Sequence, residues 1–372
     1  MGDAMKTLIL SCGTGEGHNS AALAIKEELE KRKIDCILKD ALSFGNCKAE
    51  KIVKSFFNNV AVKTPSLFGI MYKAGSKVSN AYLKSPVYFA NLVYANNMLN
   101  YIKSNNIDTI VCTHLFPMEA ITYLKRIKKL QAKTYAILTD YTAIPFIEET
   151  KLDYYLIPDD SLVKEFIKKK IPKEKIIVTG VPVSSKFKLK YDKKECRKKL
   201  SLPLDSKIVL IMTGGVGCGN VIEIVNDLIN KVDNNTVIVT LAGKNKELKS
   251  DISACFNKEK VIPVGFTDKV ELYMDASDVL LSKPGGLSST EAAVKRTALI
   301  HTMPIPGCEN NNAELFRKKG MSLVAKDIDE VVEKTIYLLE HEEKREQIIK
   351  NQIKNISFDA SKKICDFIIG KN

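Results

Sequence analysis

Short apolar segments alternate with amphipathic segments along almost the whole chain, and this alternation restricts the fold more than any other feature. Strands rich in Ile, Val and Leu that are separated by helices are typical of parallel sheets with both faces covered. The sequence therefore predicts an α/β protein. The expected strands span residues 7–11, 107–113, 134–139, 154–157 and 176–179, and in a second series 208–212, 236–241, 261–264, 279–282 and 297–302.

The strand pattern is interrupted by a lysine-rich polar stretch around residues 183–204. A length of 372 residues also suits two domains of ordinary size. We therefore expect two doubly wound, Rossmann-like domains at 1–187 and 188–355, followed by a C-terminal helix at 356–372. Ligands of such sheets bind beyond the carboxyl ends of the strands, so the site is expected in loops that face a cleft between the domains.

Cysteine usage and hydropathy exclude several classes of protein. The nine cysteines include no CxxC pair, which indicates a reducing compartment and no zinc site. No apolar run approaches the roughly 18–20 residues that span a bilayer, and the N-terminal sequence lacks the features of a secretory signal. We therefore expect a cytoplasmic protein that needs neither a metal ion nor another cofactor.

Positive charge is concentrated in one stretch of a chain whose net charge is +13. Residues 48–102 contain seven lysines and a single acid, Glu50, interleaved with Phe and Tyr side chains. Such a stretch suits binding to nucleic acid or to an anionic membrane surface. A solvated basic face over ordinary core aromatics is a third interpretation, and composition leaves all three open.

A glycine-rich turn, SCGTGEGHNS at residues 11–20, follows the first expected strand. Gly13, Gly15 and Gly17 let backbone N–H groups approach an anion beside the N-terminus of the following helix. The spacing is not the dinucleotide-binding GxGxxG, and no acidic residue is apparent at the end of a second strand, so we discount an NAD enzyme. His18 is a candidate general base near neutral pH, and a helix-capping histidine is the alternative.

Further segments after expected strands have the composition of anion-binding loops. Gly214 and Gly215 form one turn in the second domain, although Gly-Gly also marks ordinary turns. The strongest segment, SKPGGLSSTEA at residues 282–292, joins a strand to a helix whose first hydroxyls can bind a diphosphate without a metal. Its candidate donor-binding residues are Lys283, Gly285, Gly286, Ser288, Ser289, Thr290 and Glu291.

Carboxylate and amide groups in this part of the chain suit sugar hydroxyls. Glu291, one turn into the helix, can accept hydrogen bonds from a ribose, or it is a first-turn acid that only favours the helix dipole. In the segment PGCENNNA at residues 306–313, Glu309 and Asn310 offer an acceptor and an amide to neighbouring hydroxyls. Helix N-capping by an Asx residue is the alternative for this segment.

These segments, in this order, resemble the glycosyltransferase family of monogalactosyldiacylglycerol synthases and processive diacylglycerol β-glucosyltransferases. More distantly, they resemble the lipid-linked N-acetylglucosaminyltransferase of cell-wall synthesis. The matching pieces are GEGHNSAA, the SKPGG…TEA block and the PGCENNNA block, and the resemblance extends over roughly residues 6–324. One departure is Cys308, where family members commonly carry glutamine.

The resemblance implies a GT-B fold, in which two Rossmann-like domains face each other across a cleft and the C-terminal helix crosses back to the N-terminal domain. It implies inverting, metal-independent transfer of a hexose from a UDP-sugar in the C-terminal domain to diacylglycerol at the N-terminal domain. It also favours an anionic membrane surface, at the inner face of the cell membrane, over nucleic acid as the partner of the basic stretch.

The resemblance gives roles to single residues of the N-terminal domain. His18 matches the family histidine proposed as the general base that takes the proton of the acceptor hydroxyl. Asp140, after an expected strand, would orient His18 or meet the acceptor. For His114, after another expected strand, we expect a structural role in lining the cleft.

In the C-terminal domain the resemblance implies a metal-free diphosphate site. Phe266 lies where the family holds uracil, and a core phenylalanine is the equal alternative. Lys283 would add positive charge, although a lysine at a strand end is as often simply solvated. The groups that would stabilise the departing UDP are Ser288, Ser289, Thr290, Gly214 and Gly215.

Other functions compete with this interpretation. A UDP-N-acetylglucosamine 2-epimerase uses the same fold, but it calls for carboxylates in the cleft and has no use for a basic, aromatic face. Transfer to another lipid acceptor and a non-enzymatic UDP-sugar sensor are further alternatives, although pure binding requires no base such as His18. The lysine- and isoleucine-rich composition looks bacterial and favours glucose over galactose as the transferred sugar.

Overall fold

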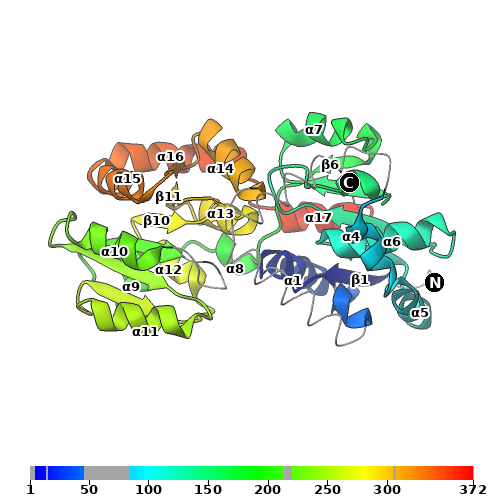
Figure 1. The fold of residues 1–372 in the computed structure, drawn as a ribbon, viewed down its shortest axis with the longest axis horizontal. Coiled ribbons are helices and arrows are strands. Elements are labelled where there is room, and N and C mark those ends of the chain that lie inside the picture. The colour runs from blue at the N-terminus through cyan, green and yellow to red at the C-terminus, as the bar shows by residue number, and fades with distance from the viewer. Residues whose placement is uncertain are drawn as a thin grey trace. The chain divides into compact units, whose positions relative to one another are not determined.

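The computed structural model describes residues 5–13, 16–45, 84–212, 214, 220–304 and 307–371. The chain divides into two compact units (Figure 1). Unit 1 contains Met1–Ser185, Ile305–Cys308 and Asp359–Asn372, and unit 2 contains Lys186–Pro304 and Glu309–Phe358. Gly15, Gly215 and residues 46–83 of the basic stretch lie outside the described residues, so the interpretations placed on them stay predictions.

Unit 1 is built on a six-stranded parallel sheet in the order β2-β1-β3-β4-β5-β6. Its strands are β1 (Lys6–Ser11), β2 (Asp35–Asp40), β3 (Thr109–Cys112), β4 (Lys133–Ile137), β5 (Tyr154–Ile157) and β6 (Ile176–Val178). The winding direction reverses between β1 and β3. The loops after these two strands therefore flank the point at which open parallel sheets bind ligands.

Helices connect the strands of unit 1, and the last helix of the chain returns to it. They are α1 (Glu16–Lys31), α4 (Pro86–Leu92), α5 (Ala95–Ser104), α6 (Leu115–Arg126), α7 (Val163–Lys168) and α17 (Ala360–Ile368), with 3-10 helices at Ala41–Phe44, Ile147–Glu149, Asp160–Leu162 and Lys173–Lys175. α17 lies beside α1 (Figure 1), and Ile364 and Ile368 share a buried core with Ile25. An Arg32–Asp366 ion pair of 2.8 Å joins the same two segments, so the chain end is part of unit 1.

Unit 2 repeats the architecture with the order β12-β11-β10-β7-β8-β9, again all parallel. Its strands are β7 (Lys207–Met212), β8 (Thr236–Leu241), β9 (Val261–Val264), β10 (Val279–Ser282), β11 (Ala298–His301) and β12 (Leu323–Val324). Its helices are α8 (Ser185–Lys188), α9 (Lys193–Lys199), α10 (Val221–Ile229), α11 (Lys246–Cys255), α12 (Val270–Ala276), α13 (Gly286–Val294), α14 (Cys308–Lys318), α15 (Ile328–Glu340) and α16 (Glu342–Asn355). The winding reverses between β7 and β10, which places the loops after them at the expected ligand position.

A buried ion pair fixes the segment that follows α8 onto unit 2. The ammonium of Lys295 and the carboxylate of Asp275, both fully buried, are in contact. Lys295 also donates to the Leu189 carbonyl at 2.5 Å, and the Tyr191 N–H donates to Asp275 at 3.2 Å. Removing one partner from such a pair leaves an uncompensated buried charge, so the segment is strongly held.

The prediction of an α/β protein with two doubly wound parallel sheets is confirmed. The sequence pattern missed two strands, β2 and β12, and both lie at a sheet edge. An edge strand is covered less than a central one, so its apolar signal is weak: every residue of β2 is at least partly exposed, and β12 has two residues. The end of β2 also corrects one expectation, because an acid, Asp40, does stand at the end of the second strand.

Candidate active site

His18 lies in the first turn of α1, at the switch point of unit 1. Its Nδ1 atom is 2.8 Å from the carbonyl oxygen of Thr113, just after β3, and 3.1 Å from the hydroxyl of Thr139, which follows β4. A carbonyl oxygen can only accept a hydrogen bond, so Nδ1 carries the proton and donates it. In the neutral ring, the other nitrogen, Nε2, then carries the lone pair, and this is the tautomer whose Nε2 can act as a base.

Thr113 also fixes the backbone of His18. Its hydroxyl donates to the His18 carbonyl at 3.1 Å, while the Ser11 hydroxyl at the end of β1 donates to the Asn19 side chain at 2.6 Å. Both threonines are buried, and His18 is partly exposed. The residues after β3 and β4 thus hold the imidazole, and the end of β1 holds the neighbouring Asn19.

His114 lies against His18 and is a second histidine of the site. The two rings are 4.7 Å apart between centroids and nearly perpendicular, at 87°. His114 is the N-cap of α6, where its Nδ1 accepts a hydrogen bond from the Phe116 N–H at 3.2 Å. Burial, with a smaller effect of His18, holds the pKa of His114 well below its usual value, so this ring is uncharged.

Asp140 follows Thr139 and is partly exposed. It was expected to orient His18, but the Nδ1 atom that such a carboxylate would hold is bound to Thr113 and Thr139. This part of the prediction is wrong, because a backbone carbonyl and a hydroxyl do the work of the carboxylate. A contact between Asp140 and the acceptor stays a prediction.

Gly13, in the segment before α1, is not the anion-binding donor that its sequence suggests. The N–H of Gly13 donates to one carboxylate oxygen of Asp40 at 3.1 Å, and the other oxygen accepts from the Leu42 N–H at 2.9 Å. This N–H is therefore engaged within unit 1 and is not a donor for an anion. Gly17 lies inside α1.

The switch point of unit 2 is a turn of glycines and a helix N-terminus. Gly214, after β7, has a φ of +75°, which favours glycine. Gly285 is the N-cap of α13, where a Cβ atom would lie 3.1 Å from the Ser288 hydroxyl. The first N–H groups of a helix have no partner within it, so those of Gly286, Leu287 and Ser288 are available to an anion. The side chain of Lys283, partly exposed, precedes this turn.

Only one of the three hydroxyls at the start of α13 is placed for a ligand. Ser288 is partly exposed and its hydroxyl donates to the Gly285 carbonyl at 3.2 Å, whereas Ser289 and Thr290 are buried. The Ser289 hydroxyl is 2.9 Å from Nε2 of His301, and that of Thr290 donates to the Gly286 carbonyl at 2.6 Å. The expectation that all three hydroxyls face a diphosphate is therefore wrong for Ser289 and Thr290, whose side chains bind inward.

Glu291 follows within the next turn of α13. Burial raises the pKa of its carboxyl to about 8, with Lys186 opposing and Glu271 reinforcing the shift. The carboxyl is therefore mostly neutral at pH 7, and a neutral acid gains nothing from the helix dipole. A neutral carboxyl both donates and accepts hydrogen bonds, which suits a pair of sugar hydroxyls.

Phe266, after β9, is 72% exposed, which excludes the core alternative. The ammonium of Lys244, in the loop after β8, lies 5.8 Å from the centre of its ring. A hollow of about 550 Å³ beside it is also lined by Lys199, Lys269 and Tyr273. Aromatic and cationic groups at the carboxyl end of the sheet suit a nucleotide.

The segment after β11 meets the turn before α13 through a residue that the sequence did not single out. Asn312 of α14 is fully buried, and its amide donates to the Pro284 carbonyl at 3.0 Å. Glu309 and Asn310 lie in the first turn of the same helix, so neither is its N-cap. Nothing in the run Asn310–Asn312 distinguishes the buried amide from its neighbours before the helix is placed.

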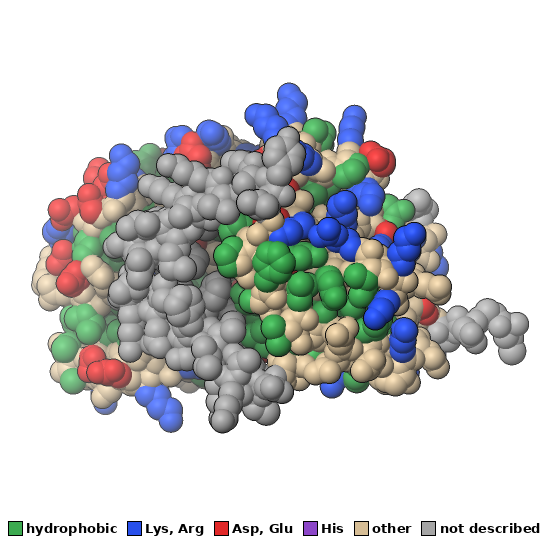
Figure 2. All heavy atoms as spheres, turned by 45° about the vertical axis from the view of Figure 1, so that its right-hand side comes forward, with side chains coloured by type: hydrophobic (Ala, Val, Ile, Leu, Met, Phe, Trp, Pro, Cys, Tyr) green, Lys and Arg blue, Asp and Glu red, His purple; other side chains and the backbone are tan. Residues whose placement is uncertain are grey.

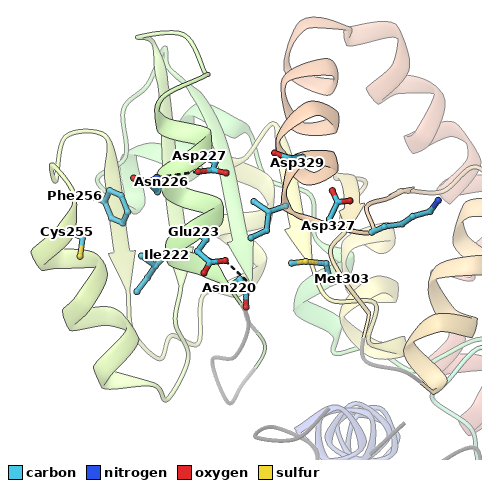
Figure 3. Close-up of a pocket in the computed structure, with 12 residues that line it drawn as sticks. Asn220, Ile222, Glu223, Asn226, Asp227, Cys255, Phe256, Met303, Asp327 and Asp329 are labelled. Atoms are coloured by element: carbon cyan, nitrogen blue, oxygen red, sulfur yellow. Dashed lines mark hydrogen bonds between the residues drawn. The ribbon is translucent and has the colours of Figure 1, made fainter. Parts of the chain in front are cut away.

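A larger pocket, of about 770 Å³, lies elsewhere in unit 2, between α10 and the start of α15 (Figure 3). Four acids line it, Glu223, Asp227, Asp327 and Asp329. Like charges repel, so this pocket does not suit a diphosphate. Within the residues that the structure describes, no helix has both the length and the apolarity to cross a bilayer.

Comparison with known proteins connects this site to a family. Residues 18–183 match the family described as Monogalactosyldiacylglycerol (MGDG) synthase, and residues 192–355 match Glycosyl transferases group 1. A processive diacylglycerol beta-glucosyltransferase of Bacillus cereus (strain G9842) is 27% identical over 372 residues, or 99% of this chain and 94% of that protein. The enzyme of the same name from Bacillus anthracis (strain A0248) is 28% identical over the same shares.

Solved structures with the same architecture include MurG of Acinetobacter baumannii, with a TM-score of 0.65, 12% identity and coverage of 98% of this chain and 99% of that one. The UDP-GlcNAc 2-epimerase of Neisseria meningitidis bound to UDP-GlcNAc has a TM-score of 0.60, 16% identity and coverage of 99% and 100%. With WaaG, a glycosyltransferase involved in lipopolysaccharide biosynthesis, the TM-score is 0.60 at 12% identity, with coverage of 98% and 100%. These likenesses confirm the predicted GT-B fold, which transferases and epimerases share.

The two matching families distinguish between these activities, since both are families of transferases and together they take in most of the chain. The chain belongs to the family of monogalactosyldiacylglycerol synthases and processive diacylglycerol glucosyltransferases, and it is a glycosyltransferase.

Proposed function

We propose that this glycosyltransferase transfers a hexose, glucose in preference to galactose, from a UDP-sugar to diacylglycerol, with inversion and without a metal ion. In the step, the glycerol oxygen forms a bond to the anomeric carbon and its proton passes to a base. The bond from that carbon to the diphosphate oxygen breaks, and UDP leaves with the electron pair. A single displacement of this kind inverts the anomeric centre.

The observation that carries the proposal is the tautomer of His18. Its Nδ1–H donates to the Thr113 carbonyl, so in the neutral ring the lone pair lies on Nε2, which is the proton acceptor. A glycerol hydroxyl is a weak acid, and it attacks usefully only if its proton leaves as the new bond forms. A base in position typically accelerates such a step by about 10²–10⁴-fold. A protein that only binds UDP-sugar has no use for this arrangement.

On the donor side, the first N–H groups of α13 and the Ser288 hydroxyl would hold the diphosphate, with Lys283 adding charge. Fixed donors aimed at the developing charge can replace a metal ion. Phe266 would stack on the uracil and Glu291 would bind the ribose. Glu309 and Asn310, in the first turn of α14, would face the sugar hydroxyls.

On the acceptor side, α4 has the polarity of a helix that faces an apolar medium. Its Asn91 is buried and donates to the carboxyl of Glu119 at 2.6 Å, while Phe89 and Val93 are 58% and 78% exposed. A helix on a water-facing surface has the reverse arrangement. We propose that Phe89 and Val93 enter the membrane that carries diacylglycerol.

Basic residues accompany this apolar face. Arg126, Lys128 and Lys129, at and after the end of α6, are exposed, and α6 packs against α4. Figure 2 shows hydrophobic side chains gathered on this side of unit 1, with Lys and Arg side chains next to them. Lys84, from the basic stretch, is instead held by the Glu149 carbonyl at 2.6 Å and by the Tyr88 ring. Anionic lipid attracts each surface cation by about 1 kcal/mol.

The experiment is an incubation of the protein with diacylglycerol in anionic vesicles and with one of three donors, UDP-glucose, UDP-galactose or UDP-N-acetylglucosamine. Lipid mass spectrometry detects the product, and we expect hexosyl-diacylglycerol from UDP-glucose in greatest yield. A His18→Asn variant, whose side chain is too weak a base, is the control for enzyme-dependent transfer.

The same assay separates the alternatives. Conversion of UDP-N-acetylglucosamine into its 2-epimer, with no glycolipid, would replace the proposal with an epimerase. Transfer that occurs only when another lipid is supplied would change the acceptor. Binding of UDP-sugar without turnover of any donor would point to a sensor.

A further inference from the structure

The base of unit 1 is oriented by two side chains to which no role in catalysis has been given, His114 and Thr139. We propose that both are positioning residues: the His114 ring blocks rotation of the His18 imidazole, and the Thr139 hydroxyl holds its Nδ1–H tautomer. The inference rests on the proposed function of His18, but its structural half does not depend on which sugar or lipid reacts.

The contact between the two histidines restricts the base. Their centroids are 4.7 Å apart at an angle of 87°, so the edge of one ring meets the face of the other. A flip of the His18 ring would exchange Nδ1 with Cδ2 and Nε2 with Cε1. The Nδ1–H would then lose its bond to Thr113, and the lone pair of Nε2 would leave its position. His114 is itself fixed, because it caps α6 and packs edge-on against Phe116 at 4.6 Å.

His114 can hold this position only while it is uncharged. Its Nδ1 accepts the Phe116 N–H, and a protonated Nδ1 has no lone pair for that bond. The ring is 8% exposed, and burial disfavours its charged form. An uncharged neighbour also spares His18 the repulsion that a second imidazolium would cause as His18 receives the proton.

Thr139 acts on the tautomer. Its hydroxyl oxygen lies 3.1 Å from Nδ1 of His18, close to the carbonyl oxygen of Thr113 that is 2.8 Å from the same atom. Two acceptors directed at one nitrogen favour the form in which that nitrogen carries the proton. Thr139 is buried after the end of β4, so its hydroxyl is not free to rotate toward solvent.

The chain is well suited to a direct test, because it contains only four histidines. Nitrogen-15 NMR of histidine-labelled protein reports the tautomer of each ring, and a His18→Asn spectrum assigns the signal of His18. The variants are His114→Asn, which keeps an acceptor for the Phe116 N–H, Thr139→Val, which removes only the hydroxyl, and Thr139→Ser, which restores it.

In the wild type we expect His18 as the Nδ1–H tautomer. His114→Asn and Thr139→Val should each give a mixture of tautomers and lower kcat by about 10-fold, with the KM for UDP-sugar and the affinity for UDP unchanged. Thr139→Ser should restore both the single tautomer and kcat. A circular dichroism melting curve like that of the wild type verifies that each variant is folded.

A wild-type His18 that is not Nδ1–H would overturn the inference, as would a single tautomer in both His114→Asn and Thr139→Val. It is also overturned if Thr139→Ser behaves like Thr139→Val, because the hydroxyl is then not the cause. If His18→Asn keeps full activity while the tautomers change as expected, the proposed function of His18 fails and the positioning contact stands.

Discussion

The two units have the same sheet and different chemistry at the same topological position. In unit 1 the segments after β1 and β3 bring together two imidazoles, and the N–H of Gly13 is already bound to Asp40. In unit 2 the loops after β7 and β10 contribute Gly214, the N-terminus of α13 and the Ser288 hydroxyl. One edge is built to take a proton and the other to hold an anion.

The topology of a parallel sheet therefore determines where a site lies, and the residues of the loops determine its chemistry. Each unit also contains a carboxyl whose pKa is raised to about 8 by desolvation, Glu119 in unit 1 and Glu291 in unit 2. Glu119 is fully buried in α6 with one oxygen unpartnered, whereas Glu291 is partly exposed beside the diphosphate turn. The raised pKa of Glu119 is therefore expected to affect stability, and that of Glu291 to affect ligand binding.

The largest expected effect is a loss of turnover without a loss of UDP binding, after a substitution in unit 1. His18→Ala should lower kcat by about 10²–10⁴-fold, because the acceptor hydroxyl loses its base, and should leave UDP affinity nearly unchanged, since the donor groups belong to unit 2. Kinetics with vesicle-bound diacylglycerol and calorimetry with UDP measure the two. His341→Ala, at the end of α15, is the matched control. A variant within a few-fold of wild type would remove His18 as the base.

A second prediction concerns the effect of the buried carboxyl of Glu119 on the pH dependence of stability. In the folded chain Glu119 keeps its proton up to about pH 8, whereas in the unfolded chain it loses it near its ordinary pKa of about 4.3. The folded state therefore binds more protons in this window, and stability falls as pH rises through it.

The side chain of a Glu119→Gln variant cannot ionise. Between pH 5 and 8, the free energy of unfolding should therefore fall less in this variant than in the wild type, by a few kcal/mol. Urea unfolding between pH 5 and 8 measures it. Glu314→Gln, at an exposed acid of α14, should keep the wild-type slope. Parallel curves for wild type and Glu119→Gln would show that Glu119 is ionised at neutral pH.

A third prediction concerns the exposed face of α4, which has no role in donor binding. Replacing Phe89 and Val93 with asparagine should reduce binding to anionic vesicles by about 10-fold, because two apolar side chains no longer leave water. Ile167→Asn, an exposed apolar position on α7 of the same unit, is the control. Equal sedimentation of all three proteins would remove α4 from the membrane-binding face.

A fourth prediction sharpens the account of unit 2. Glu291→Ala should weaken UDP binding by about 0.5–1.5 kcal/mol at pH 7, the range for hydrogen bonds of a neutral group. Glu291→Gln keeps a neutral donor and acceptor and should retain most of the affinity. Calorimetry decides: a Gln variant as weak as the Ala variant would mean that the carboxylate form binds the ribose.

Removal of divalent metal ions is expected to have no effect. UDP binding and turnover should be unchanged in EDTA, because helix N–H groups and the Ser288 hydroxyl would hold the diphosphate in place of a metal. Dialysis against EDTA followed by the vesicle assay tests this. Activity that disappears and returns with Mg²⁺ would contradict the metal-independent site of unit 2.

Local sequence patterns were enough to predict the two parallel sheets and the segments after their strands that form the candidate sites. Ile-, Val- and Leu-rich strands with helices between them favour few other folds, and glycine or hydroxyl clusters directly after strands mark the ligand edge. These are local signals, carried by residues that are neighbours in the chain. The edge strand β2 lacks them, because each of its residues is at least partly exposed.

The partners of individual side chains became apparent only once distant segments were packed together. The partners of the His18 ring, Thr113 and Thr139, are 95 and 121 residues away in the sequence. The Ser289 hydroxyl resembles that of Ser288 in the sequence, yet it is bound to His301 of β11. Whether a polar group meets a ligand or another part of the protein depends on contacts between distant segments, and no local pattern of residues encodes those.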